Sequence, residues 1–182
     1  MKHFWKEVAV VAEDGGWGIA LDGRPVRTPQ RAPLAVANAM LAEAVAAEWR
    51  EAGETIDPAA MPMTGLANAA IDLAAPDPAA FAVPVAAYAE SDLFCYRDAR
   101  DAVLAQDHWR VAALTPLVTI GGSLVAGLAL IECAFEADAL WEAVSLDDLY
   151  QERRWGADSE AQKARAANKR DWDNAARFLG LL

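Results

Sequence analysis

Two short apolar runs near the start of the chain, each followed by a turn, predict a small antiparallel sheet. Residues 4–11 are rich in aromatic and β-branched side chains and lead into Asp14-Gly15-Gly16. Residues 17–21 form the second run and lead into Asp22-Gly23, which is a strong two-residue hairpin signal. A third short strand is predicted at residues 26–28, confined to an edge by its flanking prolines, because proline cannot donate to a strand ladder.

From Leu34 onwards the apolar positions recur every three or four residues, which predicts a helix that ends near Gly53 and covers the sheet. Residues 56–62 contain two prolines and predict an extended linker, since a residue before proline avoids the helical region. We place a domain boundary here. The predicted domains are a small α/β unit at residues 1–58 and a helical unit at residues 59–182.

Helical periodicity continues to the end of the chain, and Ser159 with Gln162 forms a capping-box signature at the start of the last helix. One face of that helix, including Trp172, Ala175 and Leu179, is predicted to pack in the core. The charged stretch at 97–106 is predicted to be irregular. The expected helices span residues 64–74 with Thr64 as cap, 77–93 with Asp77-Pro78 at the start, 111–131, 135–150 and 159–182. The predicted fold class is α+β: a small N-terminal antiparallel β-sheet with a covering helix, then a larger multihelical, orthogonal bundle-like domain.

Residues 111–131 contain no charged side chain and are long enough to cross a bilayer. Pro116 and Gly121-Gly122 break or bend a helix, so we favour a buried helix or two short helices over a membrane span. Gly121-Gly122-Ser123 also resembles a phosphate-binding loop, but the lysine that such a loop needs does not follow it. Close helix packing at small residues is the simpler interpretation.

Charge and cysteine content narrow the possible partners and compartment. Sixteen basic against 27 acidic side chains give a net charge of −11, which repels nucleic acid and anionic membranes. Two distant cysteines, Cys95 and Cys133, predict neither a disulfide framework nor a zinc site and indicate a reducing compartment. The N-terminus lacks the apolar core of a signal peptide. We therefore expect a cytoplasmic bacterial protein, or one that has already been processed, without stable membrane insertion.

Few residues could carry catalysis, because the chain has only two histidines and they lie far apart in the sequence. Carboxylates are plentiful, and Glu132 with Glu136, or Asp138 with Glu142, have the four-residue spacing of one helix face. A small enzyme that uses paired carboxylates in an interdomain cleft is therefore the alternative to a non-catalytic binding protein. No catalytic residue, metal or cofactor is predicted.

Seven tryptophans are many for 182 residues, and several of them stand beside charged residues. Aromatic rings flanked by charge are typical of binding surfaces. Core packing accounts for most of them, but Trp155 is followed by Gly156, which predicts a helix end with the ring at the surface.

Several unusual strings, in a fixed order over nearly the whole chain, resemble the family of ATP synthase assembly chaperones that bind the free alpha subunit of the F1 sector. The strings are Phe4-Trp5-Lys6-Glu7-Val8 with residues 21–29; Ile56-Asp57-Pro58 with Met61-Pro62-Met63-Thr64, Leu66, Asn68 and Ala70-Ile71-Asp72; Tyr88, Ser91-Asp92-Leu93 and Cys95-Tyr96-Arg97; residues 119–124; and Leu146-Asp147, Gln151 and Trp155-Gly156.

The resemblance implies a chaperone that covers the beta-facing surface of the alpha subunit until the hexamer assembles. It implies no catalytic residues and no cofactor, and it implies a cytoplasmic location in alphaproteobacteria and the mitochondrial matrix in eukaryotic relatives. The partner-binding residues that it indicates are Asp147, Gln151, Trp155 and Gly156, with Glu152 as the nearby charge, and in second rank Asp92, Tyr96 and Arg97.

One feature departs from the family. In the family, a few dozen aromatic-rich residues separate the Cys95-Tyr96-Arg97 block from the segment that begins here at Asp107. A family segment near residues 97–107 is therefore expected to be missing, either because this member is short or because part of the chain was left out.

Overall fold

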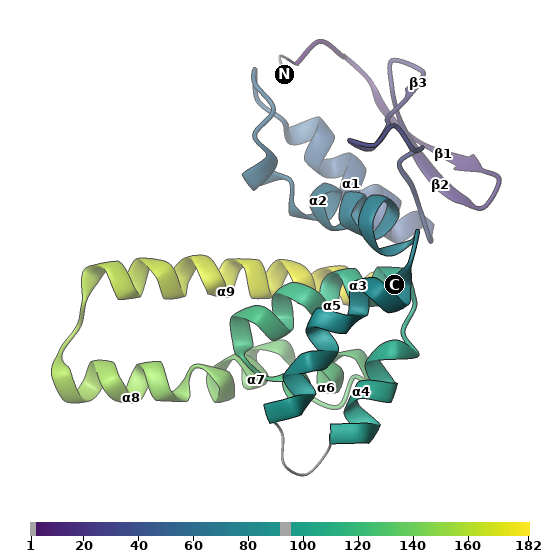
Figure 1. Cartoon of the computed structure of the whole chain (residues 1–182). Coiled ribbons are helices and arrows are strands. Elements are labelled where there is room, and N and C mark those ends of the chain that lie inside the picture. Colours follow the sequence, from purple (N-terminus) through teal and green to yellow (C-terminus); the bar gives the residue numbers. More distant parts are fainter. Residues whose placement is uncertain (1–2, 92–95) are drawn as a thin grey trace.

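The N-terminal sheet is antiparallel, as predicted. The computed structural model describes residues 3–91 and 96–182, with side chains described outside 90–98 (Figure 1). In the sheet, β2 pairs with each of the other three strands, and β1 lies on the side opposite β3. The strands are β1 (Val8–Glu13), β2 (Gly16–Leu21), β3 (Arg24–Pro25) and β4 (Ala35–Val36).

Two details of the predicted sheet are wrong. The third strand is Arg24–Pro25 rather than residues 26–28, because the chain turns at Thr28, whose backbone N–H donates to the carbonyl of Ala32 at 2.9 Å. The fourth strand, Ala35–Val36, lies where the spacing predicts the start of the helix. Pairing with β2 holds these two residues in the sheet despite their helical spacing.

The covering helix α1 spans Ala39–Glu51 and begins five residues after its predicted start. Asn38 fixes that start, because its Oδ1 accepts a hydrogen bond from the N–H of Leu41 at 2.9 Å. Leu41 and Val45 are fully buried together with Ile19 of β2, so α1 covers the sheet as predicted.

After α1 the chain is helical. The elements are η1 (Pro58–Ala60), α2 (Pro62–Ala69), the π-helical η2 (Ala70–Ala74), α3 (Pro78–Ala86), η3 (Ala87–Ser91), α4 (Tyr96–Leu104), α5 (His108–Gly121), α6 (Leu124–Ile131), α7 (Ala137–Val144), α8 (Leu146–Trp155) and α9 (Ser159–Gly180). The α+β class is thereby confirmed.

Helix α2 begins before Thr64, so the predicted cap is wrong. The carboxylate of Glu48 on α1 takes the capping role instead and accepts hydrogen bonds from the N–H groups of Met63 and Thr64 at 2.7 and 2.8 Å. The Thr64 hydroxyl donates to the same carboxylate at 2.7 Å. Met63 belongs to the buried cluster that contains the sheet and α1. The division of the chain at residue 58 stays a prediction.

The uncharged segment 111–131 is divided between α5 and α6, which confirms the expectation of two short helices. Gly122 ends α5 in the left-handed conformation with φ of 65°, and Ser123 caps α6. In the described part of the chain no single helix is long and apolar enough to cross a membrane. The helix pair Pro62–Ala74 and Pro78–Ala89 meets the length and composition criteria only when taken together, and it is bent by 111°.

Two further helix predictions are wrong. Residues 135–150 form parts of two helices, since the backbone leaves the helical region at the buried Ser145, which has φ of −90° and ψ of 1°. Residues 97–106 are mostly helical rather than irregular: Ala99 and Val103, one turn apart on α4, are buried, and α4 packs against α3 and α6.

Figure 1 shows two groups of elements, with the sheet, α1 and α2 in one and α3 to α7 in the other. The C-terminal end of α9 connects them, because Phe178 is buried in the same cluster as the sheet and α1. Further back along α9, Trp172 is buried against α5 and α6. The opposite end of α9 and the whole of α8 extend away from the body (Figure 1).

Candidate functional site

The projecting part of the molecule is a helical hairpin made of α8, the connection 156–158 and residues 159–170 of α9. We call it the arm. Gly156 ends α8 with φ of 95°, a conformation that favours glycine, as predicted for this position. Asp158, rather than the predicted Ser159, caps α9 by accepting hydrogen bonds from the N–H groups of Glu160 and Ala161. The capping-box prediction is wrong by one residue.

Helix α8 has almost no packing of its own. None of its ten residues, all of them described, is buried. Leu146, Tyr150 and Trp155 are 66%, 55% and 71% exposed. An isolated helix of this length is marginal in water, and each of these three residues is more than half exposed in the free protein. The helix therefore presents an unpartnered apolar surface.

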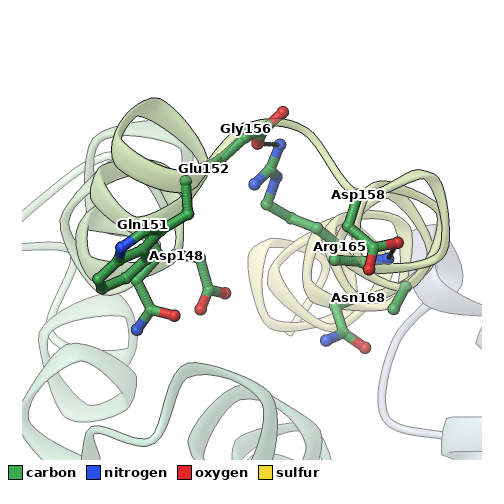
Figure 2. Close-up of a pocket in the computed structure, with 10 residues that line it drawn as sticks. Asp148, Gln151, Glu152, Gly156, Asp158, Arg165 and Asn168 are labelled. Carbon is green, nitrogen blue, oxygen red and sulfur yellow. Dashed lines mark hydrogen bonds and ion pairs between the residues drawn. The ribbon is translucent and has the colours of Figure 1, made fainter.

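Helical spacing divides α8 into two faces. Leu146 and Tyr150, four residues apart, share the outer face. The second face looks across a cleft of about 380 Å³ toward α9. Figure 2 shows Asp148 and Gln151 on one wall and Asn168 on the other. The cleft is lined by Asp148, Gln151, Glu152 and Trp155 of α8, Gly156 and Asp158 of the connection, and Ala161, Ala164, Arg165 and Asn168 of α9.

Glu152 holds the two helices of the arm together. Its Oε2 accepts a hydrogen bond from Arg165 Nη2 at 2.5 Å, and its Oε1 accepts one from Gln162 Nε2. Arg165, and then Gln162, stabilise the charged carboxylate and hold the pKa of Glu152 below its ordinary value. The cleft is thus crossed by a polar link at one end, near Gly156, and lined by exposed small residues of α9 beyond it.

The structure brings four of the five predicted first-rank residues to the cleft: Gln151, Glu152, Trp155 and Gly156. Asp147 does not line it, but its carboxylate accepts a hydrogen bond from Gln151 Nε2 at 2.8 Å. Asp92 lies outside the described residues. Tyr96 and Arg97 fall in the first turn of α4, where side chains are not described.

Sequence reasoning missed Asp148, Asp158 and every residue contributed by α9. The spacing could have indicated Asp148, because it stands four residues before Glu152 and seven before Trp155, on the same helix face. Arg165 and Asn168 belong to a different helix, so no local pattern connects them to α8.

The predicted carboxylate pair Glu132 and Glu136 does not form on one helix face, since α6 ends at Ile131 and α7 begins at Ala137. Asp138 and Glu142 do share α7, and Asp138 is paired with Lys169 at 2.9 Å. Among the described residues no group of three or more His, Cys, Asp or Glu side chains could hold a metal ion.

A family model described as ATP12 chaperone protein matches residues 2–119 of the chain. The chain belongs to the ATP12 chaperone family. This membership confirms the resemblance found in the sequence strings. Because the family model ends at residue 119, it does not include the arm.

Solved structures extend the likeness of this ATP12 family member to the whole chain. Atp12 from Paracoccus denitrificans is 30% identical, with a TM-score of 0.89 over 99% of this chain and 97% of that chain. The D202K mutant of the same protein gives a TM-score of 0.87 with the same identity and coverage. The Atu1473 protein from Agrobacterium tumefaciens is 27% identical, with a TM-score of 0.86 over 98% of this chain and 85% of that chain. The arm therefore lies within the region that these structures share.

Proposed function

We propose that this protein is an ATP synthase assembly chaperone that binds the free alpha subunit of the F1 sector and shields its beta-facing surface until the hexamer assembles. The observation that carries the proposal is the arm. Its helix α8 exposes Leu146, Tyr150 and Trp155 and has no buried residue. Membership in a chaperone family supports a role for these exposed side chains in binding a partner protein.

A subunit made for a permanent assembly exposes a large apolar interface when it is alone, and such surfaces aggregate. A helical arm with apolar side chains on its faces can cover part of that surface. The net charge of −11 keeps the free chaperone soluble, and rim charges such as Asp147 orient the encounter more than they add affinity.

The proposal requires no catalytic step, cofactor or metal. It also implies a location: the chaperone acts where F1 is assembled, which is the bacterial cytoplasm or the mitochondrial matrix.

Co-expression with the alpha subunit of the same organism, followed by size-exclusion chromatography with light scattering, tests the proposal. We expect a one-to-one complex, and alpha subunit that aggregates when it is expressed alone. Alpha subunit that stays insoluble and unbound in the presence of the chaperone would contradict the proposal.

The role of the arm is tested separately with Trp155→Ala and with the double variant Leu146→Ala/Tyr150→Ala. Each is expected to weaken the complex at least tenfold, because exposed aromatic side chains that become buried at an interface dominate its affinity. Met40→Ala is the matched control, since Met40 is 63% exposed on α1, far from the arm. Equal affinities for the arm variants and the control would show that the partner binds elsewhere.

A further inference from the structure

A second candidate binding site lies in the N-terminal group of elements, far from the arm. It is a pocket of about 300 Å³ with a mostly apolar lining. Phe4, which is 64% exposed, forms part of its rim. We call it the N-terminal pocket, and it is lined by Phe4, Leu21, Pro25, Val26 and Trp49 together with Arg24 and Arg27.

Trp49 lines this pocket and also carries an unused hydrogen-bond donor. Its indole Nε1 is buried and has no hydrogen-bond partner in the described part of the protein. The neighbouring Trp5, whose ring contacts that of Trp49, donates its own Nε1–H to the carbonyl of Trp49 at 3.2 Å. An indole nitrogen can only donate, and a buried donor without an acceptor is costly. Because Trp49 lines the pocket, its indole resonance reports on a ligand that enters it.

The two arginines give the pocket a positive charge in a protein of net charge −11. Neither Arg24 nor Arg27 forms an ion pair with any residue that the structure describes, although Arg27 Nη1 donates to the carbonyl of Arg31 at 2.8 Å. The acid nearest in sequence, Asp22, already accepts hydrogen bonds from the backbone N–H groups of Lys6 and Glu7 at 3.0 and 2.9 Å. Both guanidinium groups thus retain donors for an anion.

We propose that the N-terminal pocket binds an acidic peptide segment that carries an aromatic side chain next to a carboxylate. The aromatic ring lies against Leu21, Val26 and Phe4, and the carboxylate accepts hydrogen bonds from Arg24 and Arg27. The charges select this occupant, because an apolar pocket with two arginines in its lining matches an anion with an apolar body. This site is independent of the proposed function of the arm.

A titration followed by ¹H–¹⁵N NMR of the tryptophan indole groups tests the assignment. The probe is N-acetyl-L-phenylalanine, which has an aromatic ring and a carboxylate, and the matched control is its uncharged amide. Trp49→Phe identifies the Trp49 resonance. We expect saturable shifts of that resonance with a Kd of about 1 mM for the acid, in keeping with so small a ligand, and binding at least fivefold weaker for the amide.

Variants then distinguish the contribution of charge to binding from the contribution of shape. Arg24→Gln/Arg27→Gln is expected to reduce binding of the acid to the level of the amide, whereas Arg154→Gln, at an exposed arginine of the arm, leaves it unchanged. Trp155→Ala, which removes the proposed alpha-subunit contact, also leaves binding of the acid unchanged. The test of the N-terminal pocket therefore does not depend on the test of the arm. A Trp49 resonance that neither probe moves, or that acid and amide move equally, would overturn the proposal.

Discussion

Substitution of Gly121 by alanine tests how closely α9, whose first half forms part of the arm, packs against α5 in the core. Gly121 is the last residue of α5, and a Cβ built on it would lie 2.7 Å from Cζ3 of Trp172 on α9. An ordinary carbon contact begins near 3.4 Å, so the ring would have to move by about 0.7 Å. The ring is fully buried, contacts Trp141 at a centroid distance of 5.8 Å, and donates its Nε1–H to the carbonyl of Ala137 at 3.2 Å.

The expected magnitude follows from two opposing effects. Overpacking of a closed core costs about 1–3 kcal/mol, and alanine regains up to about 1 kcal/mol over glycine in a helix. We expect Gly121→Ala to lower the free energy of unfolding by about 1–2 kcal/mol. Gly65 on α2 is the matched control, because a Cβ there meets nothing within 4 Å. Gly65→Ala is expected to raise the free energy by about 0.5–1 kcal/mol.

Urea unfolding followed by circular dichroism and tryptophan fluorescence measures both variants. The opposite signs of the two midpoint shifts are the decisive result, since they do not depend on the absolute extrapolation. If Gly121→Ala is as stable as Gly65→Ala, then α5 and α9 are not in close contact at this glycine. Close packing at Gly121 would then not hold α9 in place.

Three further predictions concern polar links between elements. Glu48→Gln removes the charge that caps α2 and is expected to destabilise the protein by about 1–2 kcal/mol in urea unfolding, whereas Glu51→Gln on the exposed end of α1 changes little. Asn38→Ala removes the cap of α1 and the hydrogen bond from Asn38 Nδ2 to the carbonyl of Leu181, at a cost of about 1–2 kcal/mol; an unchanged midpoint would refute the capping role. Because the pKa of Glu152 is lowered in the folded protein, its link to Arg165 contributes at neutral pH and is lost as the pH falls below the ordinary glutamate value and then through the lower folded one. A ¹³C titration of the Glu152 carboxyl should show the lowered pKa, and Arg165→Gln should return it toward the ordinary value.

Much of the fold could be predicted where local chemistry decides the structure. The Asp-Gly turn of the first hairpin, the left-handed Gly122 and the Asp77-Pro78 helix start each depend on residues adjacent in the sequence. Two of the wrong predictions have a different cause, which is a partner distant in the sequence. Glu48 caps α2 from another helix, and β2 holds Ala35–Val36 in the sheet although their spacing is helical.

The candidate site also combines features that adjacent residues determine with features that depend on residues distant in the sequence. Gly156 and the exposed ring of Trp155 followed from the order of two residues, whereas the cleft needs Arg165 and Asn168 from α9. Neither residue has a local feature that connects it with α8. The resemblance of the Leu146-Asp147, Gln151 and Trp155-Gly156 string indicated the right helix, but it could not indicate the opposite wall.

The two ends of α9 have opposite surroundings, and this difference separates stability from binding. Around Trp172 the helix is buried against α5, α6 and α7, so a substitution there changes the free energy of unfolding. Residues 159–164 are exposed, and α8 beside them buries nothing, so a substitution there removes few contacts in the free protein. Trp155→Ala should therefore leave the urea midpoint unchanged while it weakens the complex with the alpha subunit. Gly121→Ala should do the reverse under conditions in which the variant remains folded.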